Sequence, residues 1–370
     1  MAKLLEITGK AISGEWGQDD DTGTGIPVLR TTNFTNEGFV NYKNVVTRSI
    51  SKKNIAEKYL RHGDVIIEKS GGSDKQPVGR VIFFEGEENK YLFNNFTGLL
   101  RVQNPEEWLP KYVFYALYTY YRNGGTRAFE NRTTGLHNLQ VDNYVKSVDI
   151  PKLSYRKQQH ICETLDHVRD AVAYRERQLT KLDELIKARF VEMFGDPYTN
   201  SKDYPLKKGK SFFKLSNGKA VPESKRLNGG IPAYGGNGIS WYTDESLFDA
   251  DTIVVGRVGF QSGNVHLVKG PLWVTDNAMY MSSCDFSQYN LTFLIELMAH
   301  VDFTKFQDAG DLKKITQKPF MQFEYLCPPL SLQNQFSAFV AEVDKSKVEV
   351  QKALDQTQLL FDSLMQQYFG

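Results

Sequence analysis

Cysteine is scarce in this sequence. Among 370 residues only Cys162, Cys284 and Cys327 are cysteines, and no two of them form a Cys-x-x-Cys pair. This spacing argues against a disulfide framework and fits a reducing compartment. The first residues, MAKLLEITGK, lack the apolar core of a signal peptide. We therefore expect a cytoplasmic protein.

Long apolar runs and an excess of charge are also missing. The longest apolar stretch, residues 112–121, is too short to cross a bilayer, so no membrane partner is expected. Lys and Arg number 45 against 44 Asp and Glu, which leaves a net charge of +1. Any binding of nucleic acid must therefore come from local basic surfaces and not from the chain as a whole.

Motifs for catalysis are absent as well. The six histidines show no metal-ligand spacing with cysteines or carboxylates, so no metal site is predicted. The Gly-Lys-Ser at 209–211 lacks the earlier glycine of a phosphate-binding loop, because position 204 is Tyr. No Gly-x-Ser-x-Gly motif occurs. We predict no catalytic residue, which leaves a self-contained nuclease or methyltransferase as an unfavoured alternative.

The sequence does contain one plan used twice. LIKARFVEMFGDP (185–197), near the midpoint, is echoed by LFDSLMQQYFG (360–370) at the end. Upstream of both, Pro-x-Leu-Ser precedes a glutamine, which pairs Gln158 with Gln335. Three more pairs follow the same order: Gly-Ile-Pro at 25–27 and 230–232, HGDVIIEKSGG (62–72) with DADTIVVGRVG (249–259), and LHNLQVDNY (136–144) with LKKITQKPF (312–320). The shared order predicts two similarly folded halves.

Each half ends in a stretch without Gly or Pro, from Pro151 to Gly195 and from Pro329 to Gly370. A helix of this length, about 40 residues, would span about 60 Å. Its apolar residues recur at intervals of three and four, which is typical of a coiled-coil seam. We expect the two helices to pack antiparallel on each other, the alternative being two unrelated amphipathic helices. The predicted seam residues are Ile161, Leu165, Val168, Val172, Leu179, Leu182, Ile186, Phe336, Val340, Val343, Val350, Leu354, Phe361 and Leu364.

The remaining halves read as mixed α/β. Short β-rich runs stand between glycine-rich turns, and one apolar helix is expected in each half, at 111–121 and 291–300. The predicted fold is α+β, with two similar globular α/β domains separated by the helix pair in a pseudo-two-fold arrangement. The predicted division is 1–149 and 198–326 for the globular domains, and 150–197 and 327–370 for the helical regions.

With these motifs the sequence resembles the specificity (S) subunits of type I restriction–modification systems over essentially its whole length. The Pro-Leu-Ser…Gln entries and the Phe-Gly(-Asp-Pro) exits of the helices carry the resemblance. Three places depart from the usual pattern: Lys152 replaces a second proline, Arg156-Lys157 replaces an acid-Gln pair, and the second exit stops at Gly370. The resemblance implies two target-recognition domains, each followed by a long spacer helix.

It also implies a function. S subunits are non-catalytic and read a bipartite, asymmetric target in double-stranded DNA. They dock methyltransferase (M) subunits, two of which are expected, and restriction (R) subunits in the full complex. S-adenosylmethionine, ATP and Mg²⁺ are then expected only in those partners, and no cofactor in this chain. A coiled-coil scaffold that binds proteins remains the rival interpretation.

Polar, donor-rich loops at matching places in both halves are the candidates for contact with DNA. Arg and Lys pair with phosphates or guanine edges, and Asn and Gln can read adenine. The alternative for any one residue is an ordinary solvated loop. In the first domain we predict Arg30, Asn33, Lys69, Ser73, Lys75, Arg127, Arg132, Thr133, His137 and Asn138. In the second we predict Tyr234, Asn237, Arg257, Gln261, Asn277, Lys313 and Lys314.

Overall fold

The computed structural model describes residues 1–133, 136–310 and 313–370, which form two compact units. Unit 1 comprises Met1–Tyr174 and Leu354–Gly370, and unit 2 comprises Arg175–Ala353. Each unit therefore contains one half of each long helix, α4 (Tyr155–Phe194) and α7 (Leu330–Phe369). The predicted domain boundaries follow the helix ends instead, and that division stays a prediction.

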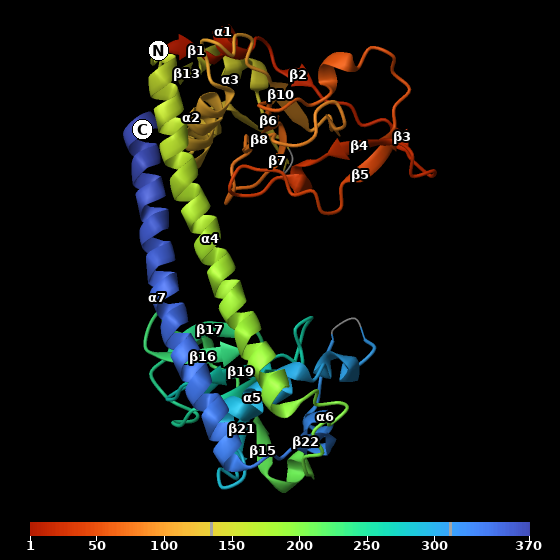
Figure 1. The fold of residues 1–370 in the computed structure, drawn as a ribbon, viewed down its shortest axis with the longest axis vertical. Coiled ribbons are helices and arrows are strands. Elements are labelled where there is room, and N and C mark those ends of the chain that lie inside the picture. Colours follow the sequence, from red (N-terminus) through yellow and green to blue (C-terminus); the bar gives the residue numbers. More distant parts are fainter. Residues whose placement is uncertain (134–135, 311–312) are drawn as a thin grey trace. The chain divides into compact units, whose positions relative to one another are not determined.

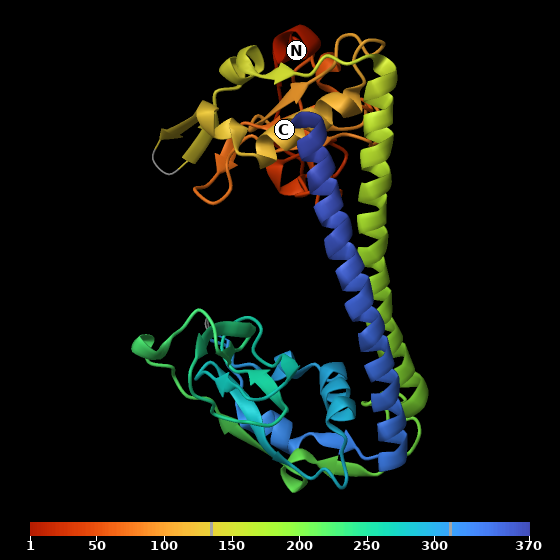
Figure 2. The same ribbon diagram turned by 90° about the vertical axis from the view of Figure 1, so that its left-hand side faces the viewer.

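The two long helices confirm the pattern seen in the sequence. Figures 1 and 2 show both as unbroken helices, and each has 40 residues. Without an internal Gly or Pro, nothing in either stretch interrupts the ladder of backbone hydrogen bonds. α4 ends at Gly195, whose φ of +77° is the left-handed conformation that commonly closes a helix. None of the described helices is both long and apolar enough to cross a membrane.

Unit 1 is built on an antiparallel sheet with the strand order β2-β10-β6-β8. All four residues of β6 are buried, and α2 (Pro110–Arg122) packs against β8 beside the first half of α4 (Figure 1). Pro110 suits the first turn of α2, because N–H groups in that turn have no acceptor within the helix and proline lacks an N–H group. The strands are β1 (Ala2–Lys3), β2 (Ile12–Ser13), β3 (Gln18–Asp19), β4 (Ile26–Leu29), β5 (Val46–Ser49), β6 (Val65–Glu68), β7 (Ser70–Gly72), β8 (Val81–Phe83), β9 (Leu92–Phe93), β10 (Thr97–Leu100), β11 (Glu130–Thr133), β12 (Leu136–Leu139) and β13 (Asp149–Ile150), and the short helices are α1 (Leu4–Thr8) and α3 (Val141–Ser147).

Unit 2 is built on an antiparallel sheet with the strand order β15-β21-β18-β19. Its core helix is α5 (Leu291–His300), which Asn290 caps by accepting hydrogen bonds from the N–H groups of Thr292 and Phe293. The strands are β14 (Leu206–Lys208), β15 (Phe213–Asn217), β16 (Ile231–Gly235), β17 (Gly238–Thr243), β18 (Thr252–Gly256), β19 (Val265–Val268), β20 (Trp273–Val274), β21 (Ala278–Cys284) and β22 (Glu324–Leu326), and the short helix is α6 (Gln317–Gln322).

The two units share one topology. The order β2-β10-β6-β8 corresponds to β15-β21-β18-β19, and the pair β1-β13 corresponds to β14-β22. In a second sheet β4 pairs parallel with β9 and antiparallel with β5, just as β16 pairs with β20 and β17. The Ile-Pro of each Gly-Ile-Pro opens β4 and β16. The prediction of two similarly folded halves is therefore confirmed.

Each unit also has a glycine that lies against a neighbouring main chain at an equivalent place. A Cβ atom on Gly14 would lie 2.1 Å from the carbonyl oxygen of Asn94, and one on Gly218 would lie 2.1 Å from that of Thr275. No side chain fits at either position. Asn94 and Thr275 are themselves equivalent, because their N–H groups donate to Leu29 and Tyr234 at 3.0 and 2.9 Å.

The predicted pairing of Gln158 with Gln335 is wrong by two residues. Gln158 is fully buried: its Oε1 accepts from the N–H of Leu109 at 2.8 Å, just before α2. Gln333 is also fully buried, and its Oε1 accepts from the N–H of Asn290 at 2.8 Å, just before α5. Gln335 is exposed. Gln158 and Gln333 are therefore the equivalent pair. They are 175 residues apart, the same distance in sequence that separates the starts and the ends of α4 and α7. The helix position is fixed by the buried side chain that accepts a hydrogen bond and not by the Pro-Leu-Ser motif.

Within each unit α4 and α7 pack together. In unit 1 Ile161 and Leu165 share a core with Phe361 and Met365. None of the predicted seam residues is exposed in its unit. Buried are Ile161, Leu165, Ile186, Phe336, Val340, Val343 and Phe361, and partly buried are Val168, Val172, Leu179, Leu182, Val350, Leu354 and Leu364.

The helix pair in unit 2 shows the direction of packing. The rings of Phe190 and Phe336 lie 5.6 Å apart, and farther along Lys347 Nζ lies 2.6 Å from Asp183 Oδ1. The residue number rises along α7 as it falls along α4, so the two segments run antiparallel. Lys347 lies at a position that interrupts the apolar seam, and its carboxylate partner explains how a charge is tolerated there.

Candidate nucleic-acid interface

One basic position recurs at the same place in both units. Lys69 follows the last residue of β6, and Arg257 follows the last residue of β18. The N–H of Lys69 donates to Phe96 O at 2.8 Å, and its carbonyl accepts from Leu139 N at 2.8 Å. The N–H of Arg257 donates to Asn277 O at 2.9 Å, and its carbonyl accepts from Ile315 N at 3.0 Å. The main chain of both basic residues is therefore held between two loops by equivalent hydrogen bonds.

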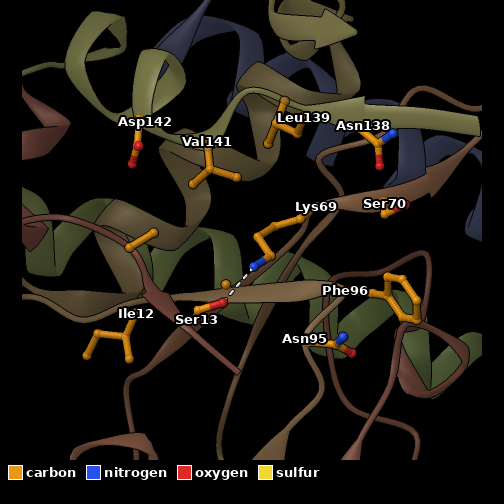
Figure 3. Close-up of a pocket in the computed structure, with 12 residues that line it drawn as sticks. Ile12, Ser13, Lys69, Ser70, Asn95, Phe96, Asn138, Leu139, Val141 and Asp142 are labelled. Atoms are coloured by element: carbon orange, nitrogen blue, oxygen red, sulfur yellow. Dashed lines mark hydrogen bonds between the residues drawn. The ribbon is translucent and has the colours of Figure 1, made fainter. Parts of the chain in front are cut away.

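Lys69 lies in a hollow of about 500 Å³ in unit 1. Figure 3 shows its side chain directed toward Ser13, and Nζ donates to Ser13 Oγ at 2.9 Å. Burial, followed by the charge of Lys58, lowers the pKa of Lys69. The polar and aromatic residues that line the hollow are Ser13, Ser70, Asn95, Phe96, Asn138 and Asp142. A cation among amides, hydroxyls, one ring and the carboxylate of Asp142 offers a phosphate contact beside groups that can meet a base.

Further predicted residues of unit 1 gather around the β7–β12 pairing, where Ser70 faces Asn138 and Gly72 faces His137. Arg127 Nη2 donates to the carbonyl of Asp74 at 3.1 Å and is otherwise exposed. Lys75 is exposed, and Ser73 closes the turn by accepting from Gln76 N at 3.1 Å. These three residues do not line the hollow and remain candidates on the neighbouring loops.

His137 is different, because it is only 7% exposed. Its Nδ1 lies 3.2 Å from Glu130 Oε2, and its Nε2 lies 3.8 Å from Asp74 Oδ1. The ring is thus engaged within the protein and holds β12 against neighbouring carboxylates. The side chains of Arg132 and Thr133 lie outside what the structure describes.

Asn33 is the last residue of a separate short helix, Thr31–Asn33, and Arg30 is the residue just before that helix. Asn33 is 1% exposed, and its amide binds main-chain groups of Arg30, Asn41 and Lys43. Arg30 Nη2 donates to the carbonyl of Asn44 at 3.1 Å. No described hydrogen bond joins either side chain to the Lys69 hollow. In this structure both side chains shape their own loop.

In unit 2 main-chain contacts bring the predicted loops together. Gly259 N donates to Lys313 O at 2.8 Å, and Val258 bridges to Lys314. Thr275 N donates to Tyr234 O at 2.9 Å, and a Cβ on Gly236 would lie 3.4 Å from Asn277 O. The loops that contain all seven predicted residues therefore meet. Asn237, Gln261, Asn277 and Lys314 are exposed, Arg257 and Lys313 are half-buried, and Tyr234 packs on the apolar cluster of Val254 and Leu272.

The shared backbone carries different side chains at equivalent positions. Leu139 and Ile315 make the same hydrogen bond, so His137 and Asn138 correspond to Lys313 and Lys314. Phe96 corresponds to Asn277, because their carbonyls accept the equivalent hydrogen bonds from Lys69 N and Arg257 N. One scaffold therefore presents two unlike sets of hydrogen-bonding and charged groups, which is the property expected of two readers of different sequences.

Among the residues that line the Lys69 hollow, sequence reasoning missed Ser13, Ser70, Asn95, Phe96 and Asp142. Phe96 and Asn95 could have been found from the match with Asp276 and Asn277, since both pairs stand just before an equivalent strand. Among the described residues no group of three or more His, Cys, Asp or Glu could hold a metal ion. Burial raises the pKa of the Cys162 thiol to about 12, so that side chain is a core residue.

Comparisons with known proteins point to one family. No protein-family model matches the chain. A chain of Haemophilus influenzae named as a type I restriction enzyme specificity subunit is 23% identical over 120 residues, 32% of this chain and 31% of that protein. The specificity subunit of the type I restriction enzyme EcoprrI of Escherichia coli is 39% identical over 51 residues, 14% of this chain and 13% of that protein. The matched segments thus span less than a third of the curated relatives.

Solved structures match over the whole chain. The S subunit of a type I restriction–modification system from M. genitalium is superposable with a TM-score of 0.59 at 16% identity, covering 100% of this chain and 95% of that one. A chain from work on complex assembly and conformational transition of the type I restriction–modification system gives a TM-score of 0.58 at 14% identity, covering 100% and 96%. The fold is that of these subunits, and the resemblance noted in the sequence is confirmed.

Proposed function

We propose that this chain is the non-catalytic DNA-recognition subunit of a type I restriction–modification complex. Residues 1–149 and 198–326 would each read one part of a bipartite, asymmetric target in double-stranded DNA. The observation that carries the proposal is the equivalence of Lys69 and Arg257, two cations fixed by identical backbone contacts among unlike neighbours. A shared scaffold explains how both domains grip a duplex, and the differing neighbours explain why they would prefer different bases.

The remaining assignments rest on the same proposal. The helical regions 150–197 and 327–370 would dock two methyltransferase subunits and, in the full complex, restriction subunits. S-adenosylmethionine, ATP and Mg²⁺ would then be bound by those partners. Incubating the purified chain with duplex DNA, S-adenosylmethionine and Mg²⁺ tests the division of labour. Methylated or cleaved DNA would contradict it.

Replacing the two equivalent cations tests the interface directly. Lys69→Ala should lower the slope of log affinity against log salt by about one unit, because one phosphate contact is lost. Arg257→Ala should cost about 1–3 kcal/mol on a preferred duplex, because a guanidinium can read guanine bidentately. Fluorescence anisotropy with labelled duplexes over a salt series measures both effects.

Lys181→Ala is the matched control, since Lys181 is an exposed residue of α4 paired with Glu184. Its affinity and salt slope should equal those of the wild-type chain. If Lys69→Ala and Arg257→Ala behave like this control, the proposed interface is wrong.

The lowered pKa of Lys69 gives a second test. The ammonium form binds phosphate, so affinity should fall as pH rises, and it should begin to fall below the pH at which an ordinary lysine titrates, about 10.4. Lys69→Arg keeps its charge over this range and should remove that part of the fall. Anisotropy titrations between pH 7 and pH 10 would show it. Identical pH profiles for the two proteins would exclude Lys69 from the contact.

A further inference from the structure

Phe260 is an apolar side chain held out in solvent. It is 90% exposed, the largest exposed fraction among the described large apolar side chains. It stands between Gly259 and Gln261, in the loop that joins β18 to β19 and follows Arg257. A single exposed apolar side chain is common on protein surfaces and is no sign of a binding site by itself, so the loop around Phe260 decides what the ring can do.

The loop that carries Phe260 is braced and cannot easily bury the ring. Gly259 N donates to Lys313 O and Gly263 N donates to Gly256 O, both at 2.8 Å. Gln307 Nε2 donates to Ser262 O at 2.7 Å, and Ser262 is fully buried. Two glycines of the loop, Gly259 just before the ring and Gly263 three residues after it, have positive φ values of +94° and +99°, which other residues rarely adopt. The main chain of the loop is therefore held in place and keeps Phe260 at the surface.

The surroundings of the ring suit a nucleic acid better than an apolar protein groove. Arg257, Lys313 and Lys314 stand on the loops tied to it, together with two carboxylates, Asp276 and Asp308. An apolar partner surface would desolvate these charges without pairing them. A duplex offers a flat π face for the ring and phosphates for the cations, and its bases also meet the amide of the adjacent Gln261.

Unit 1 has a similar combination from a different loop. Phe96 is 54% exposed and lines the hollow that contains Lys69 (Figure 3). Its carbonyl accepts the N–H of Lys69 at 2.8 Å. Both units thus have an exposed phenyl ring on a loop tied to the equivalent basic residue, although the two rings occupy non-equivalent positions.

We propose that Phe260 is an apolar wedge that stacks against a base of the bound duplex and partly unstacks one base step. This inference rests on the proposed function and adds a recognition mode to it. A ring without hydrogen-bonding groups cannot read base edges. It favours base steps that unstack easily, and it thus adds sequence preference through the deformability of the DNA.

The test uses the full chain and a duplex selected by binding from a randomised 40-base-pair pool. Stacking of one base on an aromatic side chain is typically worth a factor of about 5 to 150 in affinity, so Phe260→Ala should weaken binding by that factor. 2-Aminopurine placed at successive positions of the duplex should brighten at one step with the wild-type chain and not with Phe260→Ala. Phe260→Trp should keep both affinity and signal, because it keeps the aromatic face.

Phe286→Ala is the matched control, since Phe286 is also in unit 2, is 60% exposed, and lies between β21 and α5, away from the loop 257–263. It should bind and brighten like the wild-type chain. Equal affinity and equal 2-aminopurine signals for Phe260→Ala and the wild type would overturn the wedge while leaving DNA recognition intact. A wild-type chain that retains no duplex from the pool would instead overturn the proposed function, and the wedge with it.

Discussion

Phe190→Ala is expected to destabilise unit 2 by about 3–5 kcal/mol, the usual cost of removing a buried phenyl ring. Phe190 is completely buried, and its ring lies 5.6 Å from that of Phe293 and 5.6 Å from that of Phe336. It also stacks on His300 at 4.5 Å. Removing it leaves a cavity at the point where α4, α5 and α7 meet, and close-packed neighbours relax only partly into such a space.

Urea denaturation followed by fluorescence and circular dichroism would measure the loss as a lower transition midpoint. Val191→Ala is the control, because Val191 is the next residue of α4 and is 45% exposed. Its effect should stay within about 0.5 kcal/mol. Equal shifts for the two variants would mean that this part of α4 does not pack as described.

The position of Phe190 also shows why part of the fold escaped the sequence. It lies near the end of the first copy of the plan, in residues 185–197, yet it belongs to the core of unit 2. Conversely, Phe361 and Met365, near the end of the chain, complete the core of unit 1. A heptad seam indicates that a helix is packed but not which core it enters, so the sequence could not assign the two halves of each long helix to different units.

Other elements were predictable because their causes are local. The absence of Gly and Pro gives the two 40-residue helices, and buried runs such as Val65–Glu68 give the central strands. The pairing of LHNLQVDNY with LKKITQKPF is reproduced where Leu139 and Ile315 make the same hydrogen bond. These features need no knowledge of distant contacts.

The candidate site was predictable in part for the same reason. Lys69 and Arg257 were found because a basic residue directly follows a recognisable strand in each half. Residue type alone could not reveal that Asn33 and His137 are buried and bonded within the protein. Nor could it reveal that Phe96 and Phe260 are exposed, since most phenylalanines are core residues.

Gln333→Leu is the second change with a large expected effect, about 2–4 kcal/mol of lost stability. Leucine has nearly the same size but cannot accept the hydrogen bond from Asn290 N, nor donate those to the carbonyls of Gln288 and Pro328 at 2.9 and 2.8 Å. Each buried main-chain group left without a partner costs roughly 1–3 kcal/mol, with partial relief from water or small shifts. The start of α5 and the start of α7 would lose the link that fixes one against the other.

Gln335→Leu decides between the two alignments of the repeat. Gln335 is exposed, so its replacement should change stability by no more than about 0.5 kcal/mol. Gln158→Leu should behave like Gln333→Leu, because Gln158 bonds Leu109 N and the carbonyls of Glu107 and Leu153 in the same way. Urea midpoints for the three variants give the comparison. If Gln335→Leu proved as damaging as Gln333→Leu, the spacing of 175 residues would not describe the repeat, and the equivalence of the two helix starts would fail.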